Sequence, residues 1–198
     1  MGIDINRVAD GLTRSGVRKF TDRAALSGSL GRYIRLGLGQ PLERVDPAIL
    51  QAAARASLAG ETQYTPNIGL LPLREKLAEK LRRVNRVDVS PDQILVTIGA
   101  TYGLALVLGS ILNPGDEVLV PDPGYPNYGP LVRHYAGKPV FYTLDMGGGF
   151  CPDPGDLRRL VTPRTKAILV NSPGNPTGVA FPQPILREIV AQAERHGL

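Results

Sequence analysis

Short apolar runs alternate with amphipathic stretches from residue 94 to residue 198. The runs are too short for helices and are bounded by turn-forming residues, which is typical of buried strands. Strands separated by helical patterns favour parallel βαβ units and a sheet with helices on both faces. We therefore predict an α/β fold with a mostly parallel sheet sandwiched by helices. We expect strands at residues 94–98, 118–120, 139–144 and 166–170, and helices at 101–112, 126–136, 156–161 and 182–196.

The earlier part of the chain follows a different pattern. Residues 1–32 are polar and irregular, and we expect an arm there. Asp46 and Pro47 mark the start of a helix, because a capping side chain followed by proline is typical of a helix N-terminus. The regular alternation begins only after this point. We therefore divide the chain into an N-terminal arm with a small-domain segment at residues 1–45 and a larger domain at residues 46–198.

The run at residues 166–170 ends in a turn, residues 171–178, that contains two prolines, two glycines and two asparagines. Pro173 and Pro176 each fix a backbone angle and remove an amide donor. Asn175 lies between them and offers both a donor and an acceptor. Turns at the carboxyl ends of strands are where open α/β sheets bind ligands. The alternative is a plain strand-to-helix turn, in which such residues are also common.

Two further loops follow predicted strands. Gly99, Ala100 and Thr101 join a strand to the start of a helix, where free amides and the helix dipole favour an anion and small side chains let a phosphate approach. A simple capped turn is the alternative at this segment. Tyr125 follows the next strand, and its ring could stack on a flat ligand or could cover the sheet edge as an apolar lid. A phosphate site, an aromatic ring and a polar amide together describe a planar phosphorylated cofactor.

Composition excludes several classes of function. Cys151 is the single cysteine and there are two histidines, so neither an internal disulfide nor the usual zinc site is expected. The net charge of +5 is spread over helical patterns without a dense basic stripe, and we expect no nucleic-acid partner. The apolar run at 102–112 is too short to cross a membrane, and residues 1–10 lack the apolar core of a secretory signal. We expect a soluble, cytoplasmic protein without a metal.

Residues 171–178 resemble the Asn-x-Pro-x-Asn-Pro-Thr-Gly signature of class I/II aminotransferases, which are pyridoxal-phosphate enzymes of fold type I. The resemblance extends from about residue 33 to residue 198 and identifies the larger domain as an incomplete cofactor-binding domain. It implies pyridoxal 5′-phosphate as cofactor and the following cofactor-binding residues: Gly99, Ala100, Thr101, Tyr125, Asn175 and Tyr64.

The resemblance also implies a role for each of these residues. Residues 99–101 would bind the cofactor phosphate, Tyr125 would stack on the pyridine ring, and Asn175 would hydrogen-bond the phenolic oxygen. Tyr64 matches a tyrosine that reaches the phosphate of the neighbouring subunit, which implies a homodimer. Gly39, together with Asn175, would bind substrate, although its box reads Gly-Gln-Pro-Leu-Glu where the family usually has Gly-Glu-Pro-Asp-Phe.

The parent reaction of the family is amino transfer between an amino acid and a 2-oxo acid. The lysine that forms the Schiff base lies beyond the signature in this family, and no lysine of this chain matches it, so no catalytic residue is assigned. We expect the chain to be the N-terminal half of such an enzyme, inactive alone. The alternatives are a non-catalytic cofactor-binding or partner protein of this fold, and a carbon–sulfur lyase on the same scaffold. A nucleotide-dependent oxidoreductase is less favoured, because the G-x-G-x-x-G pattern is absent.

Overall fold

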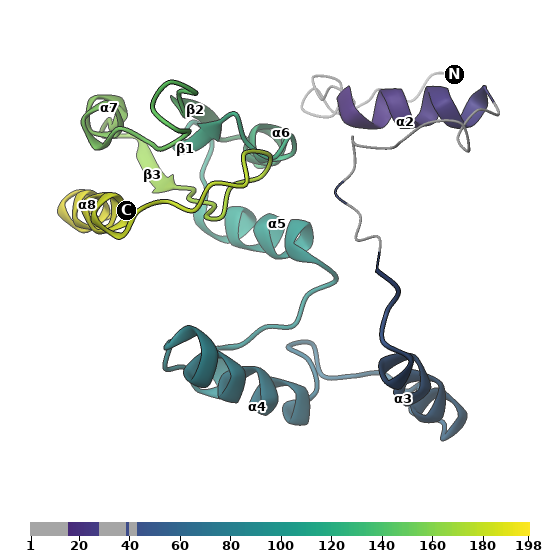
Figure 1. Cartoon of the computed structure of the whole chain (residues 1–198). Helices are drawn as coiled ribbons and strands as arrows, with labels where there is room; N and C mark the ends of the chain where they lie inside the picture. The colour runs from purple at the N-terminus through teal and green to yellow at the C-terminus, as the bar shows by residue number, and fades with distance from the viewer. Residues whose placement is uncertain (1–15, 28–38, 40–42) are drawn as a thin grey trace, which may run out of the picture. The chain divides into compact units, whose positions relative to one another are not determined.

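The computed structural model describes residues 16–27, 39 and 43–198. Residues 103–198 belong to one compact unit and residues 21–102 to another. The β-sheet lies in the first unit, and helices α3 and α4 lie in the second (Figure 1).

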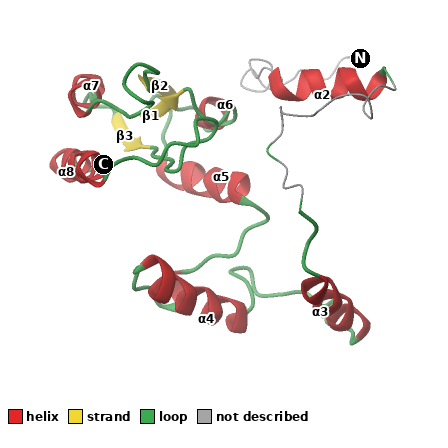
Figure 2. Cartoon of the chain, in the orientation of Figure 1, coloured by secondary structure: helices red, strands yellow, loops and turns green. Residues whose placement is uncertain are grey.

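The sheet has three parallel strands in the order β2-β1-β3 (Figure 2). They are β1 (Glu117–Asp122), β2 (Lys138–Thr143) and β3 (Thr165–Ile168). β1 pairs with β2 from Glu117 opposite Lys138 to Asp122 opposite Thr143, and β3 pairs with the other edge of β1. β1 is buried over most of its length, as its apolar sequence predicts for a central parallel strand.

Helices cover both faces of this sheet. They are α5 (Ala100–Ile111), α6 (Tyr128–His134), α7 (Pro154–Leu160) and α8 (Gln183–His196). Side chains along β1 alternate between the faces. Leu119 therefore packs into one apolar cluster with residues of α7 and α8, whereas Val118 and Val120 pack into another with residues of α5 and α6. The α/β fold with a parallel sheet between helices is thus confirmed.

Helices α3 and α4 lie in the unit of residues 21–102. α3 (Pro47–Leu58) begins as predicted, with the Asp46 carboxylate accepting from the Ala48 amide at 2.8 Å and proline in the first turn. α4 (Leu71–Lys80) continues into a π-helical turn, Leu81–Asn85. A short 3₁₀ turn, Pro91–Gln93, precedes the segment that leads to α5.

Two expectations are wrong. The stretch that we expected to be irregular contains a helix, α2 (Gly16–Leu26), in which Arg, Lys, Ala and Leu favour the helix and no glycine or proline interrupts it. Residues 94–98 are not a strand, because no described strand pairs with them. Within this segment, the Val96 amide donates to the Ile68 carbonyl at 3.1 Å, but a single hydrogen bond does not pair two strands.

Candidate functional site

The asparagine-containing turn leaves the carboxyl end of β3. The Leu169 amide donates to the Leu119 carbonyl at 2.8 Å, so the chain stays aligned with β1 just past the end of the strand. The buried Tyr142 hydroxyl donates to the Leu169 carbonyl at 2.9 Å, and burial raises the pKa of this phenol. Backbone bonds within residues 174–179 close the turn, and Asn175 is exposed. The amide of Asn175 is therefore presented from a turn whose base is fixed by the sheet.

Tyr125 lies in the turn that follows β1. Its side chain is half-buried, and its hydroxyl accepts from the Asn127 side-chain amide at 2.9 Å. Its ring meets the buried ring of Tyr128 edge-on, with centroids 5.4 Å apart and an angle of 73° between the planes. These contacts limit the freedom of the ring and place it beside the start of α6.

The structure brings the turns of Tyr125 and Asn175 to one edge of the sheet. β1 and β3 are adjacent and parallel, so their carboxyl ends point the same way. In open α/β sheets this edge is the one at which ligands bind. The alternation of strands and helices was sufficient to predict this placement.

Gly99, Ala100 and Thr101 lie at the start of α5, as predicted, although no strand precedes them. Gly99 has φ +89°, a conformation that residues other than glycine resist, and no described atom beyond its own chain neighbours lies within 4 Å of where a Cβ would be. The Thr97 hydroxyl donates to the Gly99 carbonyl at 3.1 Å. Ala100 and Thr101 are exposed, and the first turn of α5 carries no acidic side chain. The helix start is therefore open to an anion.

Gly39, Tyr64 and residues 99–101 belong to the unit of residues 21–102, and are not brought together with Tyr125 and Asn175 within one unit. The Tyr64 side chain is fully exposed, at 107% of its reference area. Gly39 is also exposed, and the three residues that follow it in its box lie outside the described residues.

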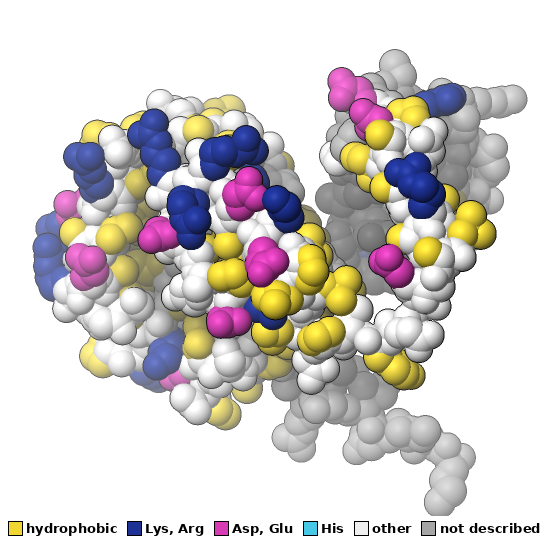
Figure 3. All heavy atoms as spheres, turned by 90° about the horizontal axis from the view of Figure 1, so that it is seen from below, with side chains coloured by type: hydrophobic (Ala, Val, Ile, Leu, Met, Phe, Trp, Pro, Cys, Tyr) yellow, Lys and Arg dark blue, Asp and Glu magenta, His cyan; other side chains and the backbone are white. Residues whose placement is uncertain are grey.

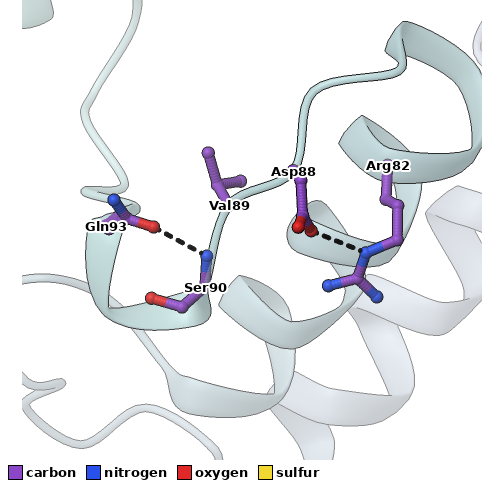
Figure 4. A pocket seen from close by; sticks show the side chains of 5 residues that line it. All are labelled: Arg82, Asp88, Val89, Ser90 and Gln93. Atoms are coloured by element: carbon purple, nitrogen blue, oxygen red, sulfur yellow. Dashed lines mark hydrogen bonds and ion pairs between the residues drawn. The ribbon is translucent and has the colours of Figure 1, made fainter.

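A hollow of about 370 Å³ lies elsewhere, beside the π-helical turn (Figure 4). Its polar groups already bind one another. Arg82 pairs with Asp88 at 3.0 Å, and the Gln93 side chain accepts from the Ser90 amide at 2.9 Å. No predicted site residue lines it, and we assign it no ligand.

Glu117 is a buried carboxylate that the sequence analysis did not single out. It lies at the amino end of β1, opposite to the edge of Tyr125 and Asn175, and accepts from the Thr162 hydroxyl at 2.6 Å and from Lys138 at 2.9 Å. These hydrogen bonds, with Thr162 the strongest influence, hold its pKa below the ordinary value. An acidic residue directly before an apolar run was the available signal. Its role is to join the strands, and it is remote from the ligand edge.

The residues that the structure describes contain neither a cluster of candidate metal ligands nor a helix that could span a membrane. No group of three or more His, Cys, Asp or Glu side chains is arranged to hold a metal ion. Among the described helices, none combines the length and apolar character required to cross a bilayer.

Comparisons with known proteins agree with the signature. The family model described as "Aminotransferase class I and II" matches residues 32–198. The aspartate/prephenate aminotransferase of Thermus thermophilus is 41% identical over 82% of this chain and 42% of its own length. A probable aspartate/prephenate aminotransferase of Thermus aquaticus is 42% identical over 82% of this chain and 43% of its length.

Solved structures give the same result. A double mutant of Thermus thermophilus aspartate aminotransferase superposes on the whole chain with a TM-score of 0.93 and 36% identity, and the match covers 52% of that protein. An alanine aminotransferase from Pyrococcus furiosus superposes on 98% of the chain with a TM-score of 0.92 and 35% identity. The chain thus spans about half the length of the relatives that it matches.

Proposed function

Because the chain belongs to the family of class I and II aminotransferases, we propose that it supplies part of the active site of an enzyme that transfers an amino group between an amino acid and a 2-oxo acid. One observation carries this proposal beyond family membership. The turns that hold Tyr125 and Asn175 leave the same edge of a parallel sheet, where a ligand would meet both side chains.

The exposed groups fit pyridoxal 5′-phosphate as the cofactor. The start of α5 has no acidic side chain and has open space at Gly99, which suits a phosphate. The half-buried ring of Tyr125 suits a flat pyridine, and the exposed amide of Asn175 can donate to a phenolic oxygen. When bound, this cofactor supplies an electron sink that makes amino transfer possible.

In this proposal each residue has a separate task. The backbone amides at the start of α5 and the Thr101 hydroxyl bind the phosphate. Tyr125 holds the plane of the ring and excludes water from one side of it. Asn175 fixes the rotation of the ring by its hydrogen bond, and with Gly39 it also contacts the substrate.

We propose that the working enzyme is a homodimer in which Tyr64 reaches the phosphate bound by the neighbouring subunit. The complete exposure of the Tyr64 ring fits this role, because nothing among the described residues covers it and it is accessible to another subunit. We also propose an arm and small-domain segment at residues 1–45, a cofactor domain at residues 46–198 and a cytoplasmic location, as suits an enzyme of amino-acid metabolism.

The test is a product analysis of the complete natural protein. With aspartate as amino donor and a 2-oxo acid such as prephenate as acceptor, we expect one new amino acid for each new 2-oxo acid. Release of ammonia or a thiol without a new amino acid would show a lyase instead. Cofactor binding without any turnover would show a non-catalytic protein, and either result would overturn the proposal.

A further inference from the structure

Arg74 lies in the first turn of α4 and is buried, with only 6% of its surface exposed to solvent. Among the described charged residues, only Arg74 and Glu117 are buried. Burying a guanidinium costs free energy unless its N–H groups find hydrogen-bond acceptors. The acceptors of Arg74 therefore indicate which parts of the chain it holds together.

Arg74 binds two separate segments of backbone. Its Nε donates to the Gly69 carbonyl at 3.1 Å, and its Nη1 donates to the Pro91 carbonyl at 2.7 Å. The same Nη1 lies 3.3 Å from the Asp92 carboxylate, whose side chain is largely exposed. The planar guanidinium thus joins the loop before α4 to the turn before residues 94–98.

A second set of contacts brings these segments together. The Val96 amide donates to the Ile68 carbonyl at 3.1 Å. Gly69 has φ +97°, and a Cβ there would lie 2.6 Å from Val96 Cγ2, so the Val96 side chain packs directly against the Gly69 backbone. Since residues 94–98 pair with no described strand, their position depends on this packing and on the Arg74 bridge.

Both segments lead to groups that we assign to the cofactor phosphate. Tyr64 precedes Gly69 in one loop, and Gly99, Ala100 and Thr101 follow residues 94–98 directly. Arg74 itself faces backbone carbonyls and is not placed to meet a phosphate. We infer that Arg74 is a positioning residue, which holds the Tyr64 loop and the start of α5 in a fixed relation so that each can meet a phosphate. This role rests on the proposed function.

The test compares two ligands of the complete natural protein, pyridoxal 5′-phosphate and pyridoxal, which lacks the phosphate. Absorbance titration gives a dissociation constant for each ligand. The dissociation constant of pyridoxal divided by that of pyridoxal 5′-phosphate measures recognition of the phosphate alone. Arg74→Gln should reduce this ratio about tenfold, the scale found when the outer partners of metal ligands are removed. A general loss of stability would weaken both ligands alike and would leave the ratio unchanged.

Two further variants complete the design. Arg82→Gln removes the same charge from the adjoining helical turn and should leave the ratio unchanged, because among the described residues Arg82 pairs with the exposed Asp88 alone. Arg74→Lys keeps the buried charge but lacks the planar fork that spans both carbonyls, and should reduce the ratio about threefold. It replaces Arg74→Gln in the comparison if the glutamine variant does not fold.

The outcomes separate the two hypotheses. If the wild-type protein binds both ligands equally, the proposed phosphate site is wrong whatever Arg74 does. If the wild type prefers the phosphorylated ligand and the folded Arg74 variants keep its ratio, the positioning role is overturned while the proposed function stands. If Arg82→Gln lowers the ratio as much as Arg74→Gln, the loss of any nearby positive charge explains the weaker recognition of the phosphate. The positioning role of Arg74 is then also rejected.

Discussion

At the scale of single residues, Glu117 shows how the sheet tolerates a buried charge. Its carboxylate is buried, but the cations beside it, Lys138 at 2.9 Å and Arg164 at 3.5 Å, keep 62% and 69% of their side-chain areas exposed. The desolvation penalty therefore falls mainly on one ion, and the Thr162 hydroxyl helps to compensate it. Because Thr162 and Arg164 precede β3 and Lys138 begins β2, one carboxylate connects all three strands at their amino ends.

We predict that Glu117→Gln lowers the free energy of unfolding by about 1–2 kcal/mol at pH 7, since the charged hydrogen bonds are lost while both cations stay hydrated. The folded-state pKa of Glu117 is depressed below its ordinary value of 4.5. Its stabilisation is therefore present above that value and is lost as the pH falls through the lower folded-state pKa. Urea unfolding at neutral and acidic pH should show the difference between variant and wild type shrinking in acid.

The control for this prediction is Glu188→Gln, which breaks the half-exposed pair with Arg158 and should cost less than about 0.5 kcal/mol. A Glu117→Gln protein as stable as the control, or a difference that grows in acid, would contradict the role given to the carboxylate.

The positions of some of these residues could be predicted from the sequence, whereas those of others could not. Tyr125 and Asn175 follow strands of a parallel sheet, so local pattern alone was enough to predict a shared edge. Arg74 lies in an amphipathic helix, where an arginine ordinarily faces water. Its burial depends on carbonyls of Gly69 and Pro91, and no short-range pattern predicts which carbonyls will meet a given side chain.

At the scale of elements, α3 and α7 make an instructive pair. Both begin with a capping aspartate followed by proline, with Asp46 accepting from the Ala48 amide and Asp153 from the Gly155 amide, each at 2.8 Å. α7 buries Leu157 in an apolar cluster, whereas no residue of α3 is buried among the described residues. The same local signal therefore starts one helix that is held by packing and another that is not.

We predict that Asp46→Ala and Asp153→Ala each cost about 1 kcal/mol, but in different ways. Loss of the α3 cap should accelerate hydrogen exchange only within Pro47–Leu58, about fivefold, because that helix can open by itself. Loss of the α7 cap should lower the global free energy of unfolding, because α7 is packed on the sheet. Exchange measured by mass spectrometry, together with urea unfolding, separates the two. A global effect of Asp46→Ala would show that α3 is packed in solution.

The elements that the sequence predicted correctly are those defined by short-range signals. β1, β2 and β3 lie close to their expected positions because apolar runs between turns are local features. The strand at residues 94–98 was wrong because a strand requires a neighbour, and no described strand takes that place. α2 was missed because its sequence mixes strong helix formers, such as Arg, Lys, Ala and Leu, with the weaker Val, Phe, Thr and Asp, and so gives no clear local signal.

At the scale of the whole molecule, the described residues include many large apolar side chains that are exposed. Apolar side chains are visible among charged ones on the face shown in Figure 3. Several belong to helix α5, including Tyr102 and Val107. Since surface of this kind is typical of interfaces, it supports the proposal that the working form contains more than one copy of the chain.

The proposed dimer makes a strong prediction about hybrids. If Tyr64 acts on the neighbouring subunit, a dimer of one Tyr64→Phe subunit and one Asn175→Ala subunit contains one site with both changes and one site with neither. If Tyr64 acts within its own subunit, each site carries one change and none is intact. We expect such a hybrid, purified with two different tags, to bind pyridoxal 5′-phosphate with wild-type affinity at half of its sites. Absorbance titration counts these sites directly. The two parent homodimers, each uniformly weakened, are the controls, and a hybrid without any wild-type site would place Tyr64 in its own subunit.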